Sequence, residues 1–552
     1  MPTAIAYRRT PLTDPAYVQL SDSAVHIEGQ LAQMIKWALA QVDVTRMSPL
    51  DAVLATKLGG YTQAPPMPDV KEATALLPGN PAQFIQTMRA ATLLASMGRD
   101  KQAMLEVLSG MQSFMDAMPQ ITEEALFMAG ADALRLTVEL YRRTGQRFLL
   151  ALLKELRAHL PDVSGVMHSF PFQRDYRQTK SGSTAQEIEY YERMQRMATG
   201  KLTADALSMT AHLAQFSGSK RDSSASRAGL AALGRFHGMP CGAFSADPFL
   251  AGRDPARAVE LSALGAQIEA YADALCVSGD RLMADALELL LVNALPDMLF
   301  EDGIRALQPT NRLFEDDTCQ IQKPTSEDVT ALLRSLYALH RSVWLAKDED
   351  TLAYMLPVAG GCITRLAGVP IRFTAAVSGT LQKTITIRTE SKEPVRCNLE
   401  LRIPAYADAA AISVNGSRPE AVLQDEMYTL SRTFQSGDVI TLTLNLSPRL
   451  EVGYRASVSV FVGSTLMALS LPNARAAWKY AVVSGSPLGG GDAQGAVQAT
   501  VVASEAPMWK EKAGFVLPPP QGVPMSQAYE LTLVPYAGTK GRIAAFPCVT
   551  ER

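Results

Sequence analysis

Apolar residues recur every three or four positions through the first part of the chain, from about residue 27 to about residue 345. This spacing matches one face of an α-helix, so the pattern predicts a series of amphipathic helices. Segments 280–295 and 327–344 show the period most clearly. Thr325 or Ser326, just before the second of these segments, can supply an N-terminal cap.

The helical part is predicted to contain about ten to twelve helices joined mostly by short connections, as in packed helical neighbours. No fixed-period repeat of the kind that builds solenoids is visible in this part. We therefore expect a closed toroid of helical hairpins rather than an open array.

After about residue 350 the period of the pattern changes to two. In VRCNLELRIP (395–404) and ITLTLNL (440–446), apolar residues alternate with polar ones, and Asn415-Gly416 is a hairpin turn signal. The second part is predicted to be antiparallel β, most simply a sandwich. We divide the chain at 1–350 (helical), 351–450 (β-sandwich) and 451–552 (C-terminal β domain).

Composition excludes several classes of partner and compartment. The 552 residues carry 52 basic and 55 acidic side chains, a formal charge of -3, without the basic stripe that nucleic acid requires. No apolar run reaches the length of about 18 residues that spans a membrane. The opening MPTAIAYRRTPLTDP has no apolar core of a signal peptide, so we expect a cytoplasmic protein. Its six cysteines are scattered, which fits reduced thiols.

The segment HGMPCGAFSADPFLAGRDPARAVELS (237–262), followed by GDRLMADALELLLVNALPDML (279–299), carries a family resemblance. Together with LRIPAYADAAAISVNG (401–416) and ELTLVPYAGTKGRIAAFP (530–547), it resembles the bacterial beta-L-arabinofuranosidase family of glycoside hydrolases. The similarity spans roughly residues 200 to 550.

The resemblance implies an (α/α)6 helical barrel whose mouth binds a small carbohydrate, packed on antiparallel β-sandwich domains. In that family a cysteine thiolate is the nucleophile, a glutamate is the acid/base, and a zinc ion bound by cysteines and a further glutamate positions the nucleophile. Members often dimerise through the β half, so a homodimer is an expectation that the resemblance alone carries.

Most of this chemistry is missing from the sequence. Glu260 matches the family's glutamate ligand, but Ser262 stands where a cysteine ligand is expected. Where relatives have a Cys-Cys pair, only Cys319 remains, and Asp247 begins a DPFL stretch where many relatives read Asp-Glu-His-Leu. Too few thiolates remain for the family's zinc site, so we expect neither a metal nor another cofactor. A different ligand set of Asp317, Cys319, Glu260 and a histidine is the alternative that the sequence leaves open.

One hypothesis is therefore a metal-independent glycoside hydrolase acting on a small oligosaccharide or glycoside. Asp247 and Glu260 are candidates for the pair of carboxylates that most such enzymes use. Cys319 is a weaker candidate nucleophile. The structural alternative is that Asp247 caps a turn and Glu260 caps or salt-links a helix.

Candidate substrate-binding residues lie in the same region. Phe244, Phe249 and Tyr271 are aromatic side chains that can stack on a sugar ring. His237 either lines the pocket or orients the loop through a backbone hydrogen bond. His212 lies about one helical turn from the position where relatives place a histidine facing the sugar.

A second hypothesis is a paralogue without catalysis that binds sugar or serves as a structural partner protein. A lyase or epimerase on the same scaffold is a third, for which Tyr190, Tyr191, His168 and His237 are available as bases without forming a recognisable set. The sequence leaves open whether the chain is an enzyme.

Overall fold

The structure is a computed structural model. It describes residues 8–42, 47–59, 64–174, 184, 199–245, 249–312, 321–470, 479–486, 488–489, 495–505, 508, 521–539 and 541–550, and all structural statements below refer to these residues. Two predicted catalytic residues, Asp247 and Cys319, lie outside them, as do the candidate bases Tyr190 and Tyr191.

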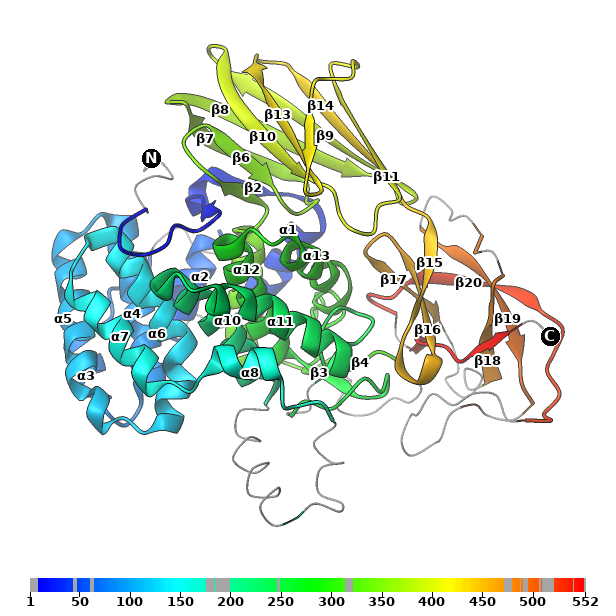
Figure 1. Cartoon of the computed structure of the whole chain (residues 1–552), viewed down its shortest axis with the longest axis horizontal. Helices are drawn as coiled ribbons and strands as arrows, with labels where there is room; N and C mark the ends of the chain where they lie inside the picture. The colour runs from blue at the N-terminus through cyan, green and yellow to red at the C-terminus, as the bar shows by residue number, and fades with distance from the viewer. Residues whose placement is uncertain are drawn as a thin grey trace.

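The first part of the chain is helical, as its apolar period predicts (Figure 1). Its helices are α1 (Gly29–Ala40), α2 (Pro49–Lys57), α3 (Val70–Thr74), α4 (Pro81–Gly98), α5 (Lys101–Ala117), α6 (Glu123–Thr144), α7 (Phe148–His159), α8 (Val163–Ser169), α10 (Gly200–Ser217), α11 (Lys220–His237), α12 (Leu261–Ser278), α13 (Arg281–Leu289) and α14 (Ser326–His340).

Six of these helices pack in a ring. In chain order, α2, α4, α6, α10, α12 and α14 each contact the next, and α14 contacts α2, so the circle closes. The remaining long helices pack outside it, with α5 on α4, α7 on α6, α11 on α10 and α13 on α12. The space enclosed by the ring is the feature that positions the candidate sites.

Side-chain caps fix where the ring helices begin. Ser48, Asn80, Thr122 and Thr199 each accept a backbone N–H of the first turn of their helix. Thr325 forms a reciprocal capping box with the third residue of α14, which confirms one of the two caps predicted there.

Two predicted helices end differently from the pattern. The segment expected to run to residue 344 leaves the helix after His340, because Trp344 already belongs to a strand with a buried indole. The segment 280–295 is α-helical only to Leu289 and continues as a π-helix over Leu290–Ala294. In both cases the apolar residues keep their spacing because they stay buried, although the backbone leaves the α-helical conformation.

Above the helical part in Figure 1 lie two six-stranded sheets. Their orders are β1-β5-β6-β10-β13-β12 and β11-β14-β9-β8-β7-β2. The strands are β1 (Val18–Gln19), β2 (Val25–Ile27), β5 (Trp344–Ala346), β6 (Thr351–Tyr354), β7 (Gly360–Leu366), β8 (Val369–Ser378), β9 (Gln382–Ser391), β10 (Val395–Arg402), β11 (Ala409–Val414), β12 (Val422–Gln424), β13 (Met427–Phe434) and β14 (Val439–Asn445).

The two sheets share an apolar interior, where the rings of Trp344, Phe373 and Phe434 contact one another. The predicted strands 395–404 and 440–446 are β10 and β14, and Asn415-Gly416 forms the turn after β11 with positive φ at both residues. Two details depart from the prediction. Strands β6 and β10 pair in parallel, and β1 and β2, which lie before the helices, join sheets assigned to residues beyond 350.

A third, eight-stranded sheet forms the C-terminal part, at the right of Figure 1. It contains β15 (Pro448–Val452), β16 (Val458–Val462), β17 (Thr465–Ser470), β18 (Tyr480–Ser484), β19 (Val497–Ala503), β20 (Tyr529–Pro535), β21 (Arg542–Ile543) and β22 (Cys548–Thr550). A short hairpin of β3 (Ala258–Glu260) and β4 (Leu307–Pro309) lies in the helical part.

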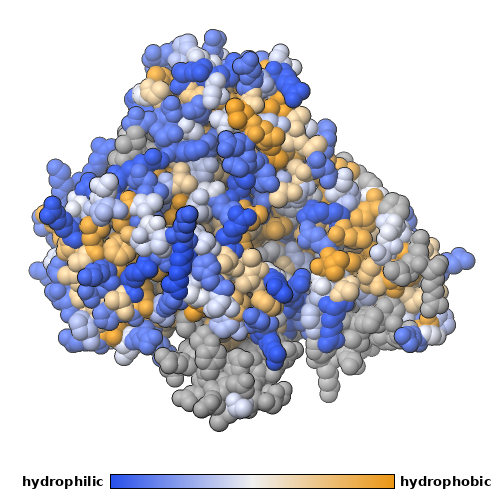
Figure 2. All heavy atoms as spheres, in the orientation of Figure 1, coloured by the Kyte–Doolittle hydropathy of each residue, from blue (hydrophilic) through white to orange (hydrophobic). Residues whose placement is uncertain are grey.

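The outer surface is mostly polar on the face that Figure 2 shows, with apolar side chains in scattered groups. Within the described residues, none of the helices combines the length and the apolar character needed to cross a membrane.

Candidate functional site

The six ring helices run in the same direction, since the C-terminal half of each contributes to one common cavity. One lining residue from each helix, in chain order, is Thr56, Ser96, Glu139, His212, Cys276 and Tyr337. We call this side the C-terminal end of the ring. The opposite side, where Glu260 precedes α12, is the N-terminal end.

At the N-terminal end, the segment with the family resemblance is held in place by His237, the last residue of α11. The fully buried imidazole contacts the carbonyl oxygen of Phe172 through Nε2 at 2.6 Å and accepts the backbone N–H of Gly252 at Nδ1, 2.9 Å away. Because a backbone N–H can only donate, Nδ1 carries no proton and Nε2–H donates to Phe172. Both ring nitrogens are thereby engaged, so His237 orients the loop and is not presented to a ligand.

A second contact fixes the same loop to α12. The side chain of Gln267 accepts the backbone N–H of Phe244 and donates to the carbonyl of Gly242 and the hydroxyl of Tyr271. Gly242 has a φ of +91°, and a Cβ there would lie 2.7 Å from Leu289, so this position requires glycine. Phe244 and Tyr271 are each 2 % exposed within the core. The prediction that these two aromatic residues stack on a sugar is therefore wrong, because their rings pack inside the protein.

Glu260 lies at the junction of β3 and α12 and is half-buried. It is the N-cap residue of α12, and its side chain makes no capping hydrogen bond. Phe249 is half-buried and pairs with Thr199 at the start of α10, which attaches the loop to a second ring helix. Asp247 falls between Ser245 and Phe249 in sequence and, like Cys319, is outside the described residues.

The described residues do not fit the zinc site that the resemblance implies. In this part of the chain, no group of three or more His, Cys, Asp and Glu side chains is placed to hold a metal ion. Cys241, the cysteine within the 237–262 segment, is 2 % exposed, and burial raises the pKa of its thiol to about 11. A neutral thiol is a poor zinc ligand, so we derive no step through a metal.

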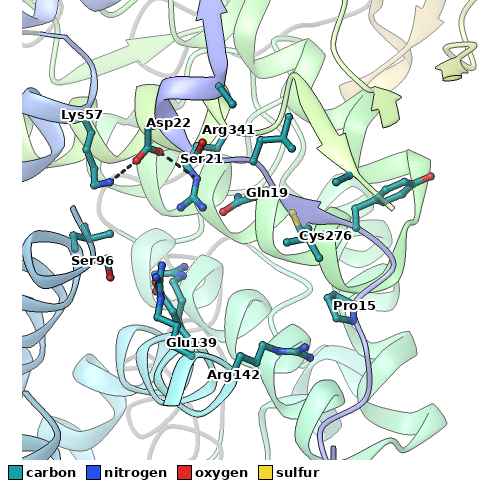
Figure 3. A pocket seen from close by; sticks show the side chains of 18 of the residues that line it. Pro15, Gln19, Ser21, Asp22, Lys57, Ser96, Glu139, Arg142, Cys276 and Arg341 are labelled. Atoms are coloured by element: carbon teal, nitrogen blue, oxygen red, sulfur yellow. Dashed lines mark hydrogen bonds and ion pairs between the residues drawn. The ribbon is translucent and has the colours of Figure 1, made fainter. Parts of the chain in front are cut away.

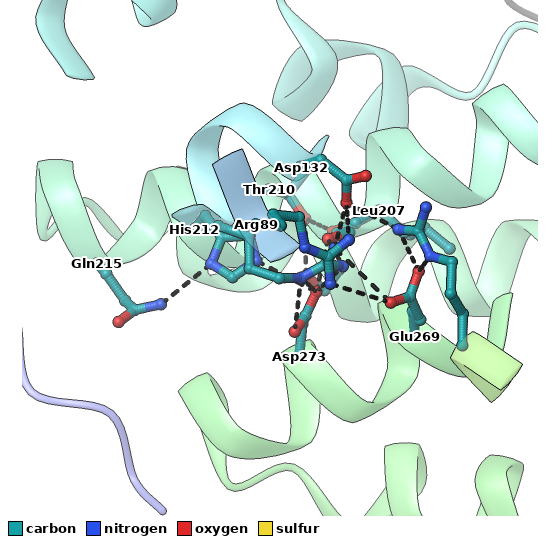
Figure 4. Close-up of polar contacts among 12 residues, drawn as sticks. Arg89, Asp132, Leu207, Thr210, His212, Gln215, Glu269 and Asp273 are labelled. Carbon is teal, nitrogen blue, oxygen red and sulfur yellow. Dashed lines mark hydrogen bonds and ion pairs between the residues drawn. The ribbon is translucent and has the colours of Figure 1, made fainter. Parts of the chain in front are cut away.

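A network of buried charges fills the middle of the ring (Figure 4). Asp132 of α6 pairs with Arg89 at 2.6 Å and with Arg334 at 2.7 Å, and so joins α4, α6 and α14. Arg135 pairs with Asp273 of α12 at 2.6 Å and donates to Ser208 of α10. Glu269 of α12 pairs with Arg334 at 2.6 Å. The network therefore connects every ring helix except α2.

The arginines keep the carboxyl groups of this network ionised. Burial by itself would raise the pKa of Asp132, Glu269 and Asp273, but Arg334 and Arg135 outweigh burial and lower all three. A carboxylate that stays ionised at neutral pH cannot give a proton to a leaving oxygen. These groups are therefore structural and are not candidates for a general acid.

His212 belongs to this network and to the opposite end of the ring. Its Nε2 lies 3.1 Å from Asp273, and its ring lines the cavity at the C-terminal end. The loop is attached at Thr199, the N-terminal cap of α10. At a rise of about 1.5 Å per residue, His212 lies about 20 Å further along this helix. The structure therefore separates His212 from Glu260 and the 237–262 segment, with which sequence reasoning grouped it.

The cavity at the C-terminal end has a volume of about 880 Å³ (Figure 3). Besides the ring helices, residues 15–24 and parts of the sheet strands line it. The carboxylate of Asp22 accepts a hydrogen bond from Lys57 and another from the hydroxyl of Tyr337, at 2.9 Å. It also lies 3.6 Å from Nε of Arg341. Burial would raise the pKa of Asp22, but Arg341 and Lys57 lower it.

Sequence reasoning missed both the network and the cavity. One signal was available, because Asp132 and Arg135 interrupt the apolar stretch LFMAGADALRLTVEL of α6 one turn apart. Charged residues on the buried face of a helix indicate partners on neighbouring helices. The partners themselves come from helices far away in sequence, which no local pattern identifies.

Comparisons with known proteins find a family model that matches one part of the chain. Residues 354–446, from the end of β6 to the end of β14, match the model of the beta-L-arabinofuranosidase GH127 middle domain. Over these residues the chain is similar to the middle domain of the GH127 family. The resemblance read from the sequence is thereby confirmed.

Solved structures share the fold over the whole chain. A structure described as a glycoside hydrolase has a TM-score of 0.71 and 15% identity, and the match covers 98% of this chain and 99% of the other. A GH127 beta-L-arabinofuranosidase from Geobacillus stearothermophilus T6 has a TM-score of 0.58 and 14% identity, covering 96% and 100%. A further GH127 beta-arabinofuranosidase has a TM-score of 0.56 and 13% identity, covering 97% and 98%. No curated protein sequence matches the chain.

Proposed function

We propose that the chain is a glycoside hydrolase whose reaction takes place at the N-terminal end of the ring, with Asp247 and Glu260 as its two carboxylates. The GH127 relation supports the reaction class. We also propose that the ring is the inner layer of an (α/α)6 barrel and that the two six-stranded sheets form a β-sandwich, as the closed helix contacts and the shared apolar interior suggest.

The observation that carries the proposal is how firmly the 237–260 segment is attached at the N-terminal end. His237 holds Gly252, Gln267 holds Gly242 and Phe244, and Phe249 pairs with Thr199. A catalytic carboxylate needs a fixed position relative to the scissile bond. The residues that make these contacts come before and after Asp247 in the sequence.

The two carboxylates are suited to different roles. Glu260 precedes the first turn of α12, where the unpaired N–H groups of the helix stabilise negative charge. We assign it the role of nucleophile or base, and Asp247 that of the acid that protonates the leaving oxygen. The carboxyl–carboxyl separation would decide whether the sugar configuration is retained or inverted.

The cavity at the opposite end is the competing location, and its chemistry does not favour hydrolysis. Its inner carboxyl groups, Asp22, Glu139 and Asp273, have pKa values lowered by arginine and lysine neighbours despite burial. None of the three can act as an acid near neutral pH. The N-terminal end is therefore the better candidate.

The test is hydrolysis of a panel of aryl glycosides that includes a beta-L-arabinofuranoside, with added zinc and with a chelator. We expect turnover that resists the chelator and falls by about 100-fold or more in Asp247→Asn and in Glu260→Gln, the usual loss when an acid or base is removed. Asp302→Asn, which changes an exposed carboxylate, is the matched control and should keep wild-type turnover.

Two results would overturn this assignment. Turnover that the chelator abolishes would point to a metal-dependent reaction and to Cys319. A folded protein without turnover on any sugar would favour the alternative that the chain binds sugar, or serves as a structural partner, without catalysis.

A further inference from the structure

We propose that the cavity at the C-terminal end of the ring is a second carbohydrate site, which binds an uncharged mono- or disaccharide without cleaving it. This site is separate from the N-terminal end, and its existence does not depend on the proposed hydrolysis.

The cavity has the size and the opening of a ligand site. Its volume of about 880 Å³ lies within the range of roughly 300–1,000 Å³ that is usual for small-molecule pockets. Met97 and Arg99 at the end of α4, and Glu349 and Arg365 on the sheet side, line the cavity and are exposed. These residues mark an opening to solvent between α4 and the sheet.

The charges of the wall favour an uncharged ligand. Cationic side chains outnumber carboxylates among the lining residues, and the carboxylates Asp132 and Glu269, which pair with the lining residues Arg89 and Arg135, are shared with Arg334. The C-terminal ends of six helices, which carry partial negative charge, also converge on the cavity. The fixed charges therefore nearly balance, and a ligand with net charge of either sign gains little.

The polar groups that remain available suit hydroxyl groups. Arg341 is an ion-pair neighbour of Asp22 and stacks on Tyr337, yet its buried Nε has no hydrogen-bond partner among the described residues. In Figure 3 its side chain lies beside Asp22 at the edge of the same space as Glu139 and Gln19. Donors such as Arg341 and acceptors such as Glu139 therefore line the same cavity, and a sugar hydroxyl can accept from one and donate to the other.

Apolar side chains complete the match to a sugar. Tyr17, Leu20, Leu93, Val138 and Val277 line the cavity between the charged groups. A pyranose or furanose ring presents C–H faces as well as hydroxyls, so it can contact both kinds of surface. An inorganic anion would use only the arginines.

The first experiment is calorimetric titration of the full chain with L-arabinose, D-galactose and cellobiose as neutral probes. Glucuronate serves as the anionic probe and glucosamine as the cationic one. We expect at least one neutral sugar to bind, and each charged probe to bind more weakly than the tightest-binding neutral sugar. Tighter binding of glucuronate or of glucosamine than of every neutral sugar would overturn the charge argument.

Three variants locate the binding. Arg341→Gln removes the guanidinium and should weaken binding about tenfold or more, the effect of losing one hydrogen bond to a charged group. Ser96→Tyr fills the cavity without changing its charge and should weaken binding by at least as much. Arg388→Gln on β9 is the matched control, because Arg388 is exposed and does not line the cavity. Unchanged affinity in both cavity variants would contradict the proposal.

A measurement on the wild type covers the case in which a variant does not fold. In hydrogen exchange, the bound sugar should protect residues 93–99 and 135–143, and Glu260→Gln should keep this protection. Protection confined to residues 249–262 would assign the bound sugar to the N-terminal end and reject the second site, whatever the outcome of the hydrolysis assay.

Discussion

His237 shows how one buried side chain organises the loop at the N-terminal end of the ring. It joins two stretches, around Phe172 and around Gly252, that are distant in sequence. Both partners are main-chain groups, so the contacts are independent of the neighbouring side chains. The sequence left two roles open for this histidine, and the structure selects the one in which it orients the loop.

We predict that His237→Leu keeps the volume of the side chain but releases the loop. Two buried backbone groups, one carbonyl and one N–H, lose their partner, so stability should fall by about 2–4 kcal/mol. Hydrogen exchange of residues 244–252 should become faster, and kcat should fall more than KM rises. His26→Leu is the control, because the side chain of His26 is 77% exposed. Unchanged exchange in the loop would show that His237 does not hold it.

The aromatic residues show the limit of reasoning from single positions. Their place in sequence near the candidate carboxylates predicts that Phe244 and Tyr271 bind sugar. Their burial depends on how the loop packs on α12 and α13, which is a tertiary feature. Glu260, by contrast, lies at a helix start, as the sequence predicts, because the helical period of α12 begins directly after it.

At the scale of elements, Asp222 joins four helices near the start of α11. Its carboxylate accepts Ser164 of α8, Ser217 at the end of α10 and Ser219 before α11, and pairs with Arg157 of α7. The side chain is 1% exposed. Burial would raise its pKa, but the serine hydroxyls and Arg157 lower it to about 2.

The lowered pKa of Asp222 gives a prediction about pH. Because the folded-state pKa is below the unfolded value of about 3.9, the stabilisation is complete above that value and is lost as pH falls toward 2. The shift corresponds to about 2 kcal/mol. Asp222→Asn should therefore increase hydrogen exchange in α8 and α11 at pH 7. When the pH is lowered, exchange in these helices should increase less in the variant than in the wild type. Glu106→Gln, an exposed carboxyl on α5, should change neither.

The elements themselves were largely predictable. A period of 3.6 or of 2 is a local property, so the helices before residue 340 and strands β10 and β14 follow from it. The short strands β1 and β2 do not, because two or three residues carry no period and are strands only through pairing with β5 and β7. The parallel pairing of β6 with β10 is also not predictable from a local period, because it depends on the path of the chain between these two strands.

At the scale of the whole molecule, a buried ion pair attaches the third sheet to the helical part. Both Nη atoms of Arg542 donate to the carboxylate of Asp297, at 2.8 and 2.7 Å, and neither side chain is exposed. Arg542 also donates to the carbonyls of Pro309 and Thr310. The pair therefore connects β21 with the chain after α13.

Replacing one partner of the Arg542–Asp297 pair should destabilise the protein more than replacing both. Arg542→Met or Asp297→Leu alone leaves a buried charge without its principal partner, so each should cost about 3–5 kcal/mol, and the double variant should cost less than either. Thermal melting with limited proteolysis measures this, with release of the C-terminal sheet in the single variants. Arg388→Gln, an exposed arginine on β9, is the control. A double variant as unstable as the sum of the two single ones would show that the pair is not coupled.

The division of the ring into two ends is also a property of the whole molecule, and it is the feature that sequence reasoning could not supply. The segment with the family resemblance marks the N-terminal end, whereas the cavity at the other end is built from residues spread between Pro15 and Leu366. The central claim is that catalysis belongs to the first of these ends.

The most direct test compares turnover and binding in Glu260→Gln on the best wild-type substrate of the glycoside panel. We predict that turnover falls by about 100-fold or more, while calorimetry still detects binding of the sugar. Turnover retained in this variant, in a folded protein, would contradict the account and move the reaction away from the N-terminal end of the ring.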